Sequence, residues 1–209
     1  YVFHQLTWLG AESADSPERA YGVNSYFVGK LMDACRSVSG MVLGSTGAVY
    51  LHGHSRWDES GLIGPRSTYA TSKFGGEVLG QFLCEQWGTP TCILRYHHPY
   101  GPGGGLVAQV ARQVLNGEEI EVGPSGRVPR YTPQYITDCI RLTIRAAEHC
   151  SVPARMINFG GEEEVSLREL AEMIAETAGV EPKLRETEDV PMFWVADVGL
   201  MTRLLGRPE

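Results

Sequence analysis

The chain has 209 residues and a formal net charge of −7 at pH 7. This length can form one large domain, or one domain with a small lobe. The negative charge disfavours a general nucleic-acid-binding protein. The sequence contains no run of about 18 apolar residues that would predict a membrane span, and no signal peptide is predicted at its start. The five cysteines show no close pairing, which indicates reduced core residues in a cytoplasmic protein.

Strand-like and helix-like segments alternate along the first part of the chain. Strands are predicted at 1–6, 40–45 and 91–96, and helices at 16–37 and 67–88. Ser16 is the expected N-cap of the first helix, with Pro17 in its first turn, and Gly88 ends the second helix. Short apolar strands between helices are typical of a parallel sheet that has helices on both faces.

The pattern changes after Pro99. A glycine-rich loop is followed by predicted helices at 106–119, 135–149 and 166–179 and predicted strands at 120–123 and 154–161. Ser166 and Glu169 have the spacing of a capping box at the start of the last helix. We predict that this part is a smaller, mixed α/β lobe interleaved with the last strands of the sheet.

Three polar stretches follow predicted strands or open the helix between them. "STGAVY" begins at Ser45, "YATSK" runs from Tyr69 to Lys73, and "HHPYGP" begins at His97. Ligands of open α/β sheets bind beyond the carboxyl ends of the strands. We therefore expect these three stretches to meet at one site.

Tyr69 and Lys73 are four positions apart, which places them on one face of a helix, one turn from each other. Gly76 and Gly80 continue that face and allow close approach of a backbone or a ligand. A nearby ammonium is expected to lower the pKa of the phenol, and a hydroxyl such as that of Thr46 can hold a substrate oxygen. This set would serve as an acid–base couple in redox chemistry. The alternative is an ordinary surface helix with a chance pair.

Several segments, in order along nearly the whole chain, resemble motifs of the extended short-chain dehydrogenase/reductases. "YATSK" resembles the YxxxK motif of that group, and "STGAVY" its SSxxVYG segment. Further similar segments are "VFHQLT", "VNSYFVGKLMDAC", "LRYHHPYGPGG", "YITDCIRLTIRAAE", "INFGGEEEVSLRELAEMIAE" and "ADVGLMTRLLGRPE". The chain is thus similar to the NAD-dependent epimerase/dehydratase family. The resemblance implies a Rossmann-like doubly wound parallel sheet and a substrate lobe.

The resemblance also implies domain boundaries and roles for single residues. Residues 1–99 and 131–160 would form a partial dinucleotide-binding domain, and residues 100–130 and 161–209 the substrate-binding lobe. Tyr69 would be the catalytic acid/base, Lys73 would bind the nicotinamide ribose, and Thr46 would hold the reacting oxygen. The cofactor would be NAD, with NADP as the alternative. Further residues expected at the cofactor or substrate are Ser45, Leu6, Thr7 and His98.

Two departures from the family pattern affect the cofactor and the reaction. No GxxGxxG loop occurs in the sequence, so the resemblance begins after the usual glycine-rich part, and we expect a fragment of a longer protein. If Tyr1 were the true start, tight NAD binding would not be expected. Dehydratases of the family carry Asp-Glu after the catalytic Thr. Here Gly47 and Ala48 take those places, which argues against dehydration.

Histidines and arginines are the remaining candidates for ligand contacts. His98 takes the place of the usual Asn and is expected to contact substrate. With His97, His52 and His54 it fits no standard metal-ligand spacing, so no metal is predicted. Arg130 and Arg185 are candidates for gripping a diphosphate. Solvated surface arginines are the alternative.

Three functions remain open at this stage. The first is an NAD(P)-dependent epimerase or oxidoreductase that acts on a nucleotide sugar. The second is an NAD(P)H-dependent reductase of a non-sugar carbonyl, and the third is a truncated, non-catalytic relative that acts as a binding module. The resemblance further implies a homodimer that forms through the YxxxK helix and the helix before it. In that case the apolar side with Phe74, Val78 and Phe82 would suit either the interface or the sheet.

Overall fold

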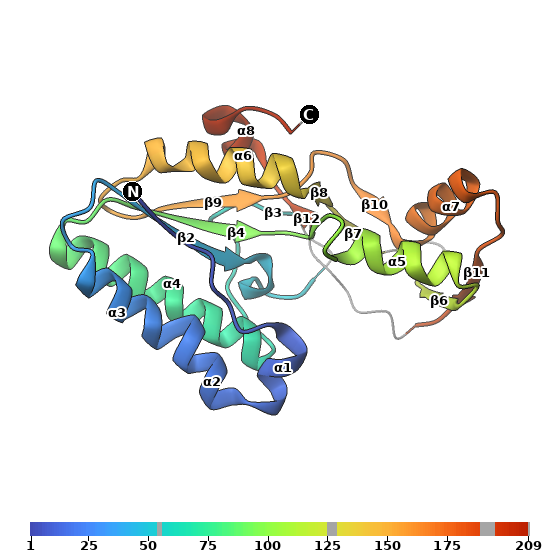
Figure 1. Cartoon of the computed structure of the whole chain (residues 1–209), viewed down its shortest axis with the longest axis horizontal. Helices are drawn as coiled ribbons and strands as arrows, with labels where there is room; N and C mark the ends of the chain where they lie inside the picture. The colour runs from blue at the N-terminus through green and yellow to red at the C-terminus, as the bar shows by residue number, and fades with distance from the viewer. Residues whose placement is uncertain (54–55, 125–128, 189–194, 209) are drawn as a thin grey trace.

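A computed structural model describes residues 1–53, 56–124, 129–188 and 195–208. Its centre is a four-stranded parallel sheet with the strand order β1-β2-β4-β9. These strands are Val2–His4, Met41–Thr46, Thr91–Tyr96 and Arg155–Phe159. Helices cover both faces of the sheet (Figure 1). The structure therefore confirms the predicted α/β class with a parallel sheet.

The strands bury side chains on both faces of the sheet. Met41 and Leu43 of β2 pack with helices α3 (Phe27–Ala34) and α4 (Thr68–Trp87). Val42, between them, packs with α6 (Ile136–Ala146) and α8 (Gly199–Leu205) on the other face. Successive strand residues point to opposite faces, so a nearly continuous apolar strand needs a helical layer on each side.

The predicted helix at 16–37 runs from Pro17 to Ala34 in the structure, contains a π-helical turn, and is preceded by a short helix that was not predicted. Helix α1 (Gly10–Asp15) is followed by α2 (Pro17–Tyr21) and by a π-helical segment, Gly22–Tyr26, that leads into α3. Pro17 occupies the first turn as predicted, but the Ser16 side chain makes no cap hydrogen bond. Ser16 therefore occupies the predicted N-cap position, but its side chain does not cap the helix, and its N–H bonds the carbonyl of Glu12 at the end of α1.

A smaller group of elements lies beyond the carboxyl ends of the strands (Figure 1). It contains helices α5 (Leu106–Leu115) and α7 (Leu167–Ala178) and the parallel pair β6 (Glu119–Val122) and β11 (Lys183–Glu186). Their apolar side chains form a separate core around Val110, Ile120 and Leu170. The predicted capping box is confirmed, because Ser166 and Glu169 each bond the backbone N–H of the other, at 3.1 and 2.7 Å.

Short strand pairs connect the loops with the rest of the chain. They join β3 (Arg56–Trp57) with β12 (Val195–Ala196), β5 (Pro99–Tyr100) with β8 (Gln134–Tyr135), and β7 (Arg130–Tyr131) with β10 (Val165–Ser166). The predicted division into two parts stays a prediction. At its C-terminal end the chain returns to the sheet, where Ala196, Met201 and Leu205 join the core under α6. In the described ranges, no helix combines the length and the apolar character that crossing a membrane requires.

Candidate active site

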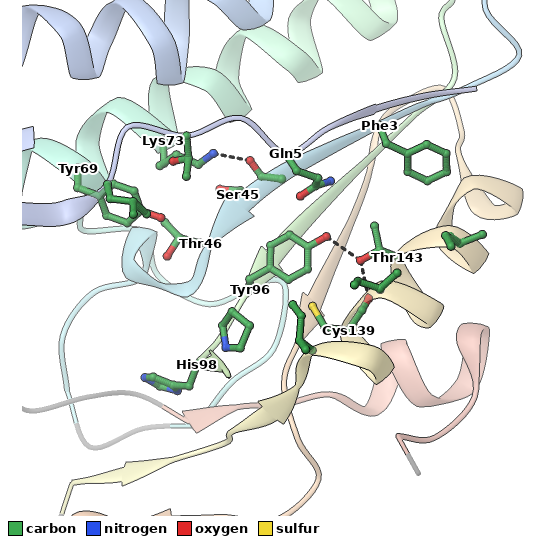
Figure 2. Close-up of a pocket in the computed structure, with 17 residues that line it drawn as sticks. Phe3, Gln5, Ser45, Thr46, Tyr69, Lys73, Tyr96, His98, Cys139 and Thr143 are labelled. Carbon is green, nitrogen blue, oxygen red and sulfur yellow. Dashed lines mark hydrogen bonds between the residues drawn. The ribbon is translucent and has the colours of Figure 1, made fainter. Parts of the chain in front are cut away.

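A cavity of about 590 Å³ lies between α4 and α6, where β1, β2 and β4 end. Its polar wall carries Ser45, Thr46, Tyr69 and Lys73, and its opposite wall is mostly apolar, with Phe3, Ile136, Cys139, Ile140 and Ile144. Figure 2 shows these two walls, and between them the Tyr96 hydroxyl bonded to Thr143 at 2.8 Å. All three polar stretches that the sequence placed at this edge therefore line one cavity. The third contributes His98 and Pro99.

The start of α4 places Tyr69 and Lys73 at this cavity. The Ser67 side chain caps the helix by accepting a hydrogen bond from the backbone N–H of Ala70 at 3.1 Å, which satisfies one of the free N–H groups of the first turn. Tyr69 is the second residue of the helix, and Lys73 lies one turn later. The cap therefore fixes the backbone from which both side chains project.

Glycines let neighbouring backbone pack closely against α4, as the sequence predicted. A Cβ on Gly76 would lie 2.3 Å from the carbonyl oxygen of Asn24, and one on Gly80 would lie 2.8 Å from a methyl group of Leu43. The π-helical segment that contains Asn24 can thus pack directly against α4. There the Asn24 amide accepts from Trp8 N–H at 2.8 Å and donates to the Ser72 hydroxyl at 2.9 Å. Asn24 thereby ties the loop after β1 to α4.

Lys73 is buried, with its side chain directed to the end of β2. Its Nζ donates a hydrogen bond to the carbonyl of Gly44 at 2.5 Å. Burial lowers the pKa of Lys73 to about 8, and the carboxylate of Glu77 opposes this change. The ammonium therefore titrates close to neutral pH, and it has further N–H donors beyond the one given to Gly44.

The pKa of Tyr69 departs from its usual value in the direction opposite to our expectation. Burial raises this pKa, and hydrogen bonds with Thr46 and Thr7 offset part of the increase. The expected lowering by Lys73 is wrong for this structure because desolvation of the phenolate dominates. Tyr69 is thus a neutral phenol at pH 7, with hydroxyl groups near it that oppose the increase in its pKa.

A buried polar network that the sequence did not reveal lies behind this wall. Ser45 donates to the Glu77 carboxylate at 2.5 Å, and Arg95 of β4 bonds both oxygens of the same carboxylate, at 3.0 and 2.8 Å. Arg95 also donates to the Tyr50 hydroxyl, which donates to Asn158 of β9. Arg95, a charge inside the apolar run "TCILRY", was the available signal, because buried charges need a partner.

His97 and His98 point to different sides of β4. His98 lines the cavity, and its ring packs edge-on against Tyr131 with centroids 5.0 Å apart. Its φ of 50° is uncommon for a residue other than glycine. The His97 ring lies on the other side against Gly47, where an added Cβ would come within 2.2 Å of a ring atom. Burial lowers the pKa of His98 to about 4 and, with nearby positive groups, that of His97 to about 3.

The other candidate ligand residues lie away from the cavity. Arg130 and Arg185 are not among the described residues that line it. Arg130 pairs with Glu164 and Glu169, and Arg185 pairs with carboxylates of β6. Leu6 is 55% exposed and also lies outside the lining, whereas Thr7 belongs to it.

In the part of the chain that the structure describes, no group of three or more potential ligands could hold a metal ion. His52 is described and His54 lies outside the described residues.

Comparisons with known proteins point to one family. The family model described as "NAD dependent epimerase/dehydratase family" matches residues 1–160. The chain is 26% identical to an uncharacterized UDP-glucose epimerase of Bacillus subtilis over 98% of this chain and 67% of that protein. It is 32% identical to the dTDP-4-dehydro-6-deoxy-D-allose reductase of Streptomyces bikiniensis over 66% of this chain and 41% of that protein. The chain thus spans about two thirds of the first relative and less than half of the second.

Solved structures share the fold over the whole chain. The UDP-glucuronic acid 4-epimerase of Bacillus cereus in complex with NAD has a TM-score of 0.85 at 24% identity, covering 100% of this chain and 69% of that one. The UDP-glucose 4-epimerase of Thermotoga maritima with UDP-glucose has a TM-score of 0.84 at 23% identity, with 100% and 72% covered.

Proposed function

The chain belongs to the NAD dependent epimerase/dehydratase family, and from this premise we propose that it is part of an NAD(P)-dependent epimerase or oxidoreductase of a nucleotide sugar. The observation that carries the proposal is the meeting of Tyr69, Lys73 and Thr46 at the polar wall of one cavity. Relatives with similar sequences act on UDP- or dTDP-linked sugars, as their names state.

Proton transfer is the task that these residues can perform. Thr46 and Tyr69 both line the cavity, so a substrate hydroxyl beside both could lose its proton to Tyr69 or regain it there. When bound, NAD would supply the nicotinamide ring that accepts a hydride. The donor set fits such a cofactor, because the buried Lys73 ammonium borders the cavity with N–H groups to offer to ribose hydroxyls.

The neighbouring residues favour epimerisation or simple redox chemistry over dehydration. Gly47 and Ala48 follow Thr46 and carry no acid or base. A reaction that expels a hydroxyl group needs a proton donor beside it, and these positions supply none.

The test uses the protein expressed in full, with NAD and a UDP-sugar such as UDP-glucose or UDP-glucuronic acid. Proton NMR of the sugar would follow inversion at a ring carbon, and absorbance at 340 nm would follow release of NADH. Tyr69→Phe should reduce turnover at least about 100-fold, whereas Tyr21→Phe, at an exposed tyrosine of α2, should leave it unchanged. Full activity of the Tyr69→Phe protein would overturn the proposal.

We further propose that the protein forms a homodimer through α4 and the helix before it, which consists of the π-helical segment Gly22–Tyr26 and α3. Val78 and Phe82 of α4 are 48% and 61% exposed, and Tyr26 is 63% exposed. Phe74, in contrast, packs inward beside Tyr50. Light scattering should give a dimer mass that Phe82→Glu reduces to a monomer mass. Leu115→Glu, at an exposed leucine of α5, is the matched control, and a monomeric parent protein would contradict this proposal.

The cytoplasm is the compartment we propose, since all five cysteines are free and persistent free thiols are typical of reducing compartments.

A further inference from the structure

The Glu77–Arg95 ion pair lies directly behind the candidate site, yet the proposed proton transfer does not use it. The two side chains are 0% and 5% exposed. Both oxygens of Glu77 are bonded by Arg95, and one of them also accepts the Ser45 hydroxyl. A charged pair removed from water in this way is costly to keep unless its geometry is good, so its place beside the site calls for an explanation.

Two neighbouring residues of β2 connect this pair with Lys73. Gly44 accepts the hydrogen bond of Lys73 Nζ at 2.5 Å, and the next residue, Ser45, donates to Glu77 at 2.5 Å. Lys73 and Glu77 are one turn apart on the same buried face of α4. Two hydrogen bonds thus join the end of β2 to α4. In one the helix supplies the donor, Lys73, and in the other it supplies the acceptor, Glu77.

Arg95 fixes the position of the carboxylate from the side of the sheet. Its NH1 donates to the Tyr50 hydroxyl at 2.8 Å and to the carbonyl of Glu59 at 3.3 Å. The Tyr50 hydroxyl in turn donates to Asn158 of β9 at 2.7 Å. Glu77 therefore cannot turn toward another partner without breaking a network that spans three strands.

The groups around Lys73 differ in their effect on its charge. Burial disfavours the ammonium, and Glu77 favours it. His4, from β1, is neutral at pH 7 because burial and Lys73 both lower its pKa. Tyr69 is a neutral phenol, and Arg95 lies behind Glu77, bonded to it. Among the described residues, Glu77 is thus the anionic group whose charge acts on Lys73.

We propose that Glu77, held in place by Arg95, is a positioning residue that keeps Lys73 charged and fastened to the end of β2. The proposal rests on the proposed function for its purpose, since a charged Lys73 donates stronger hydrogen bonds to a cofactor or a substrate than a neutral amine does. The effect of Glu77 on Lys73 involves only residues of this chain, so it can be measured without cofactor and without substrate.

The chain allows a direct measurement because it contains only three lysines, Lys30, Lys73 and Lys183. In protein labelled with carbon-13 at the lysine Cε, NMR titration gives one curve for each lysine, and the curve of Lys73 is the one that is absent from the spectrum of Lys73→Arg. Lys73 should titrate with a midpoint near 8. Glu77→Gln should lower this midpoint by about one pH unit or more.

Two further variants separate this role from a general effect on the fold. Glu85→Gln makes the same change at an exposed position of the same helix, and it should leave the Lys73 midpoint unchanged. Glu77→Gln leaves Arg95 buried without its partner, so Glu77→Gln/Arg95→Met, which removes both charges, provides a second folded test. It too should lower the midpoint.

An unchanged Lys73 midpoint in the Glu77 variants would overturn the inference. Unfolding of both variants would also overturn it, because the pair would then be a requirement of the fold. A protein that passes the titration test but turns over no nucleotide sugar would contradict the proposed function and leave the role of Glu77 standing, so the two failures can be told apart.

Discussion

Charged side chains are used differently in the sheet and in the smaller group formed by α5, β6, α7 and β11. At the sheet, Glu77 of α4 and Arg95 of β4 are almost completely buried, the carboxylate accepts a hydrogen bond from Ser45 of β2, and the guanidinium donates one to the Tyr50 hydroxyl. In the smaller group, Arg185 pairs with Glu119 and Glu121 through side chains that are 50%, 58% and 55% exposed. Water competes for the second set and not for the first. The same ionic contact should therefore have very different energetic consequences in the two regions.

The largest expected effect is that of Glu77→Gln on stability. The substitution leaves the Arg95 guanidinium buried without a counter-charge, which should reduce the free energy of unfolding by about 3–5 kcal/mol. Urea denaturation would measure this loss, and Glu77→Gln/Arg95→Met should recover most of it. A cost below about 1 kcal/mol for the single variant would remove the difference between the two regions.

Acid should destabilise the sheet region through the two histidines that follow β4. The folded-state pKa values of His97 and His98, about 3 and about 4, lie below the unfolded value of about 6.5. The unfolded state therefore binds more protons between these values. Stability is complete above about pH 6.5 and falls as the pH decreases, by roughly 3–4 kcal/mol at pH 5. Urea denaturation at pH 7.5, 6 and 5 tests this, and His98→Gln should remove about half of the dependence.

Substitutions in the smaller group should reduce the free energy of unfolding by less, even where they remove hydrogen bonds of good geometry. Ser166→Ala removes the cap of α7 and should reduce the free energy of unfolding by about 1 kcal/mol. Ser37→Ala, at an exposed serine, is the matched control. Thermal unfolding of the two variants would measure the difference, and equal melting temperatures would show that the capping box adds nothing measurable.

The smallest effect is expected for Arg185→Gln. Its two ion pairs are exposed, so their loss should change the free energy of unfolding by only about 0.2–1 kcal/mol. High salt should reduce even this difference. A loss similar to that of Glu77→Gln, measured in the same urea experiment, would contradict the contrast between buried and exposed pairs.

The parts of the site that the sequence predicted are those that local rules determine. Tyr69 and Lys73 share a face because of helical geometry, and Thr46 joins them because the carboxyl ends of parallel strands meet at one edge. Arg130 and Arg185 obey no such rule. They lie on two- and four-residue strands whose placement depends on tertiary packing, and glutamates near them take up their charges.

Two further features were beyond sequence reasoning for physical reasons. The direction of the Tyr69 pKa depends on the depth of burial, which a spacing pattern does not contain. The Glu77–Arg95 pair joins residues 18 positions apart on different elements, so no helical or strand periodicity connects them.

The contact between Gly47 and the His97 ring links two positions in the evolution of this chain. Any side chain at 47 would collide with the imidazole, so a carboxylate could enter that turn only after residue 97 had become smaller. A single substitution therefore cannot place a carboxylate at 47, and a viable order of changes at these two positions exists only if 97 changes first.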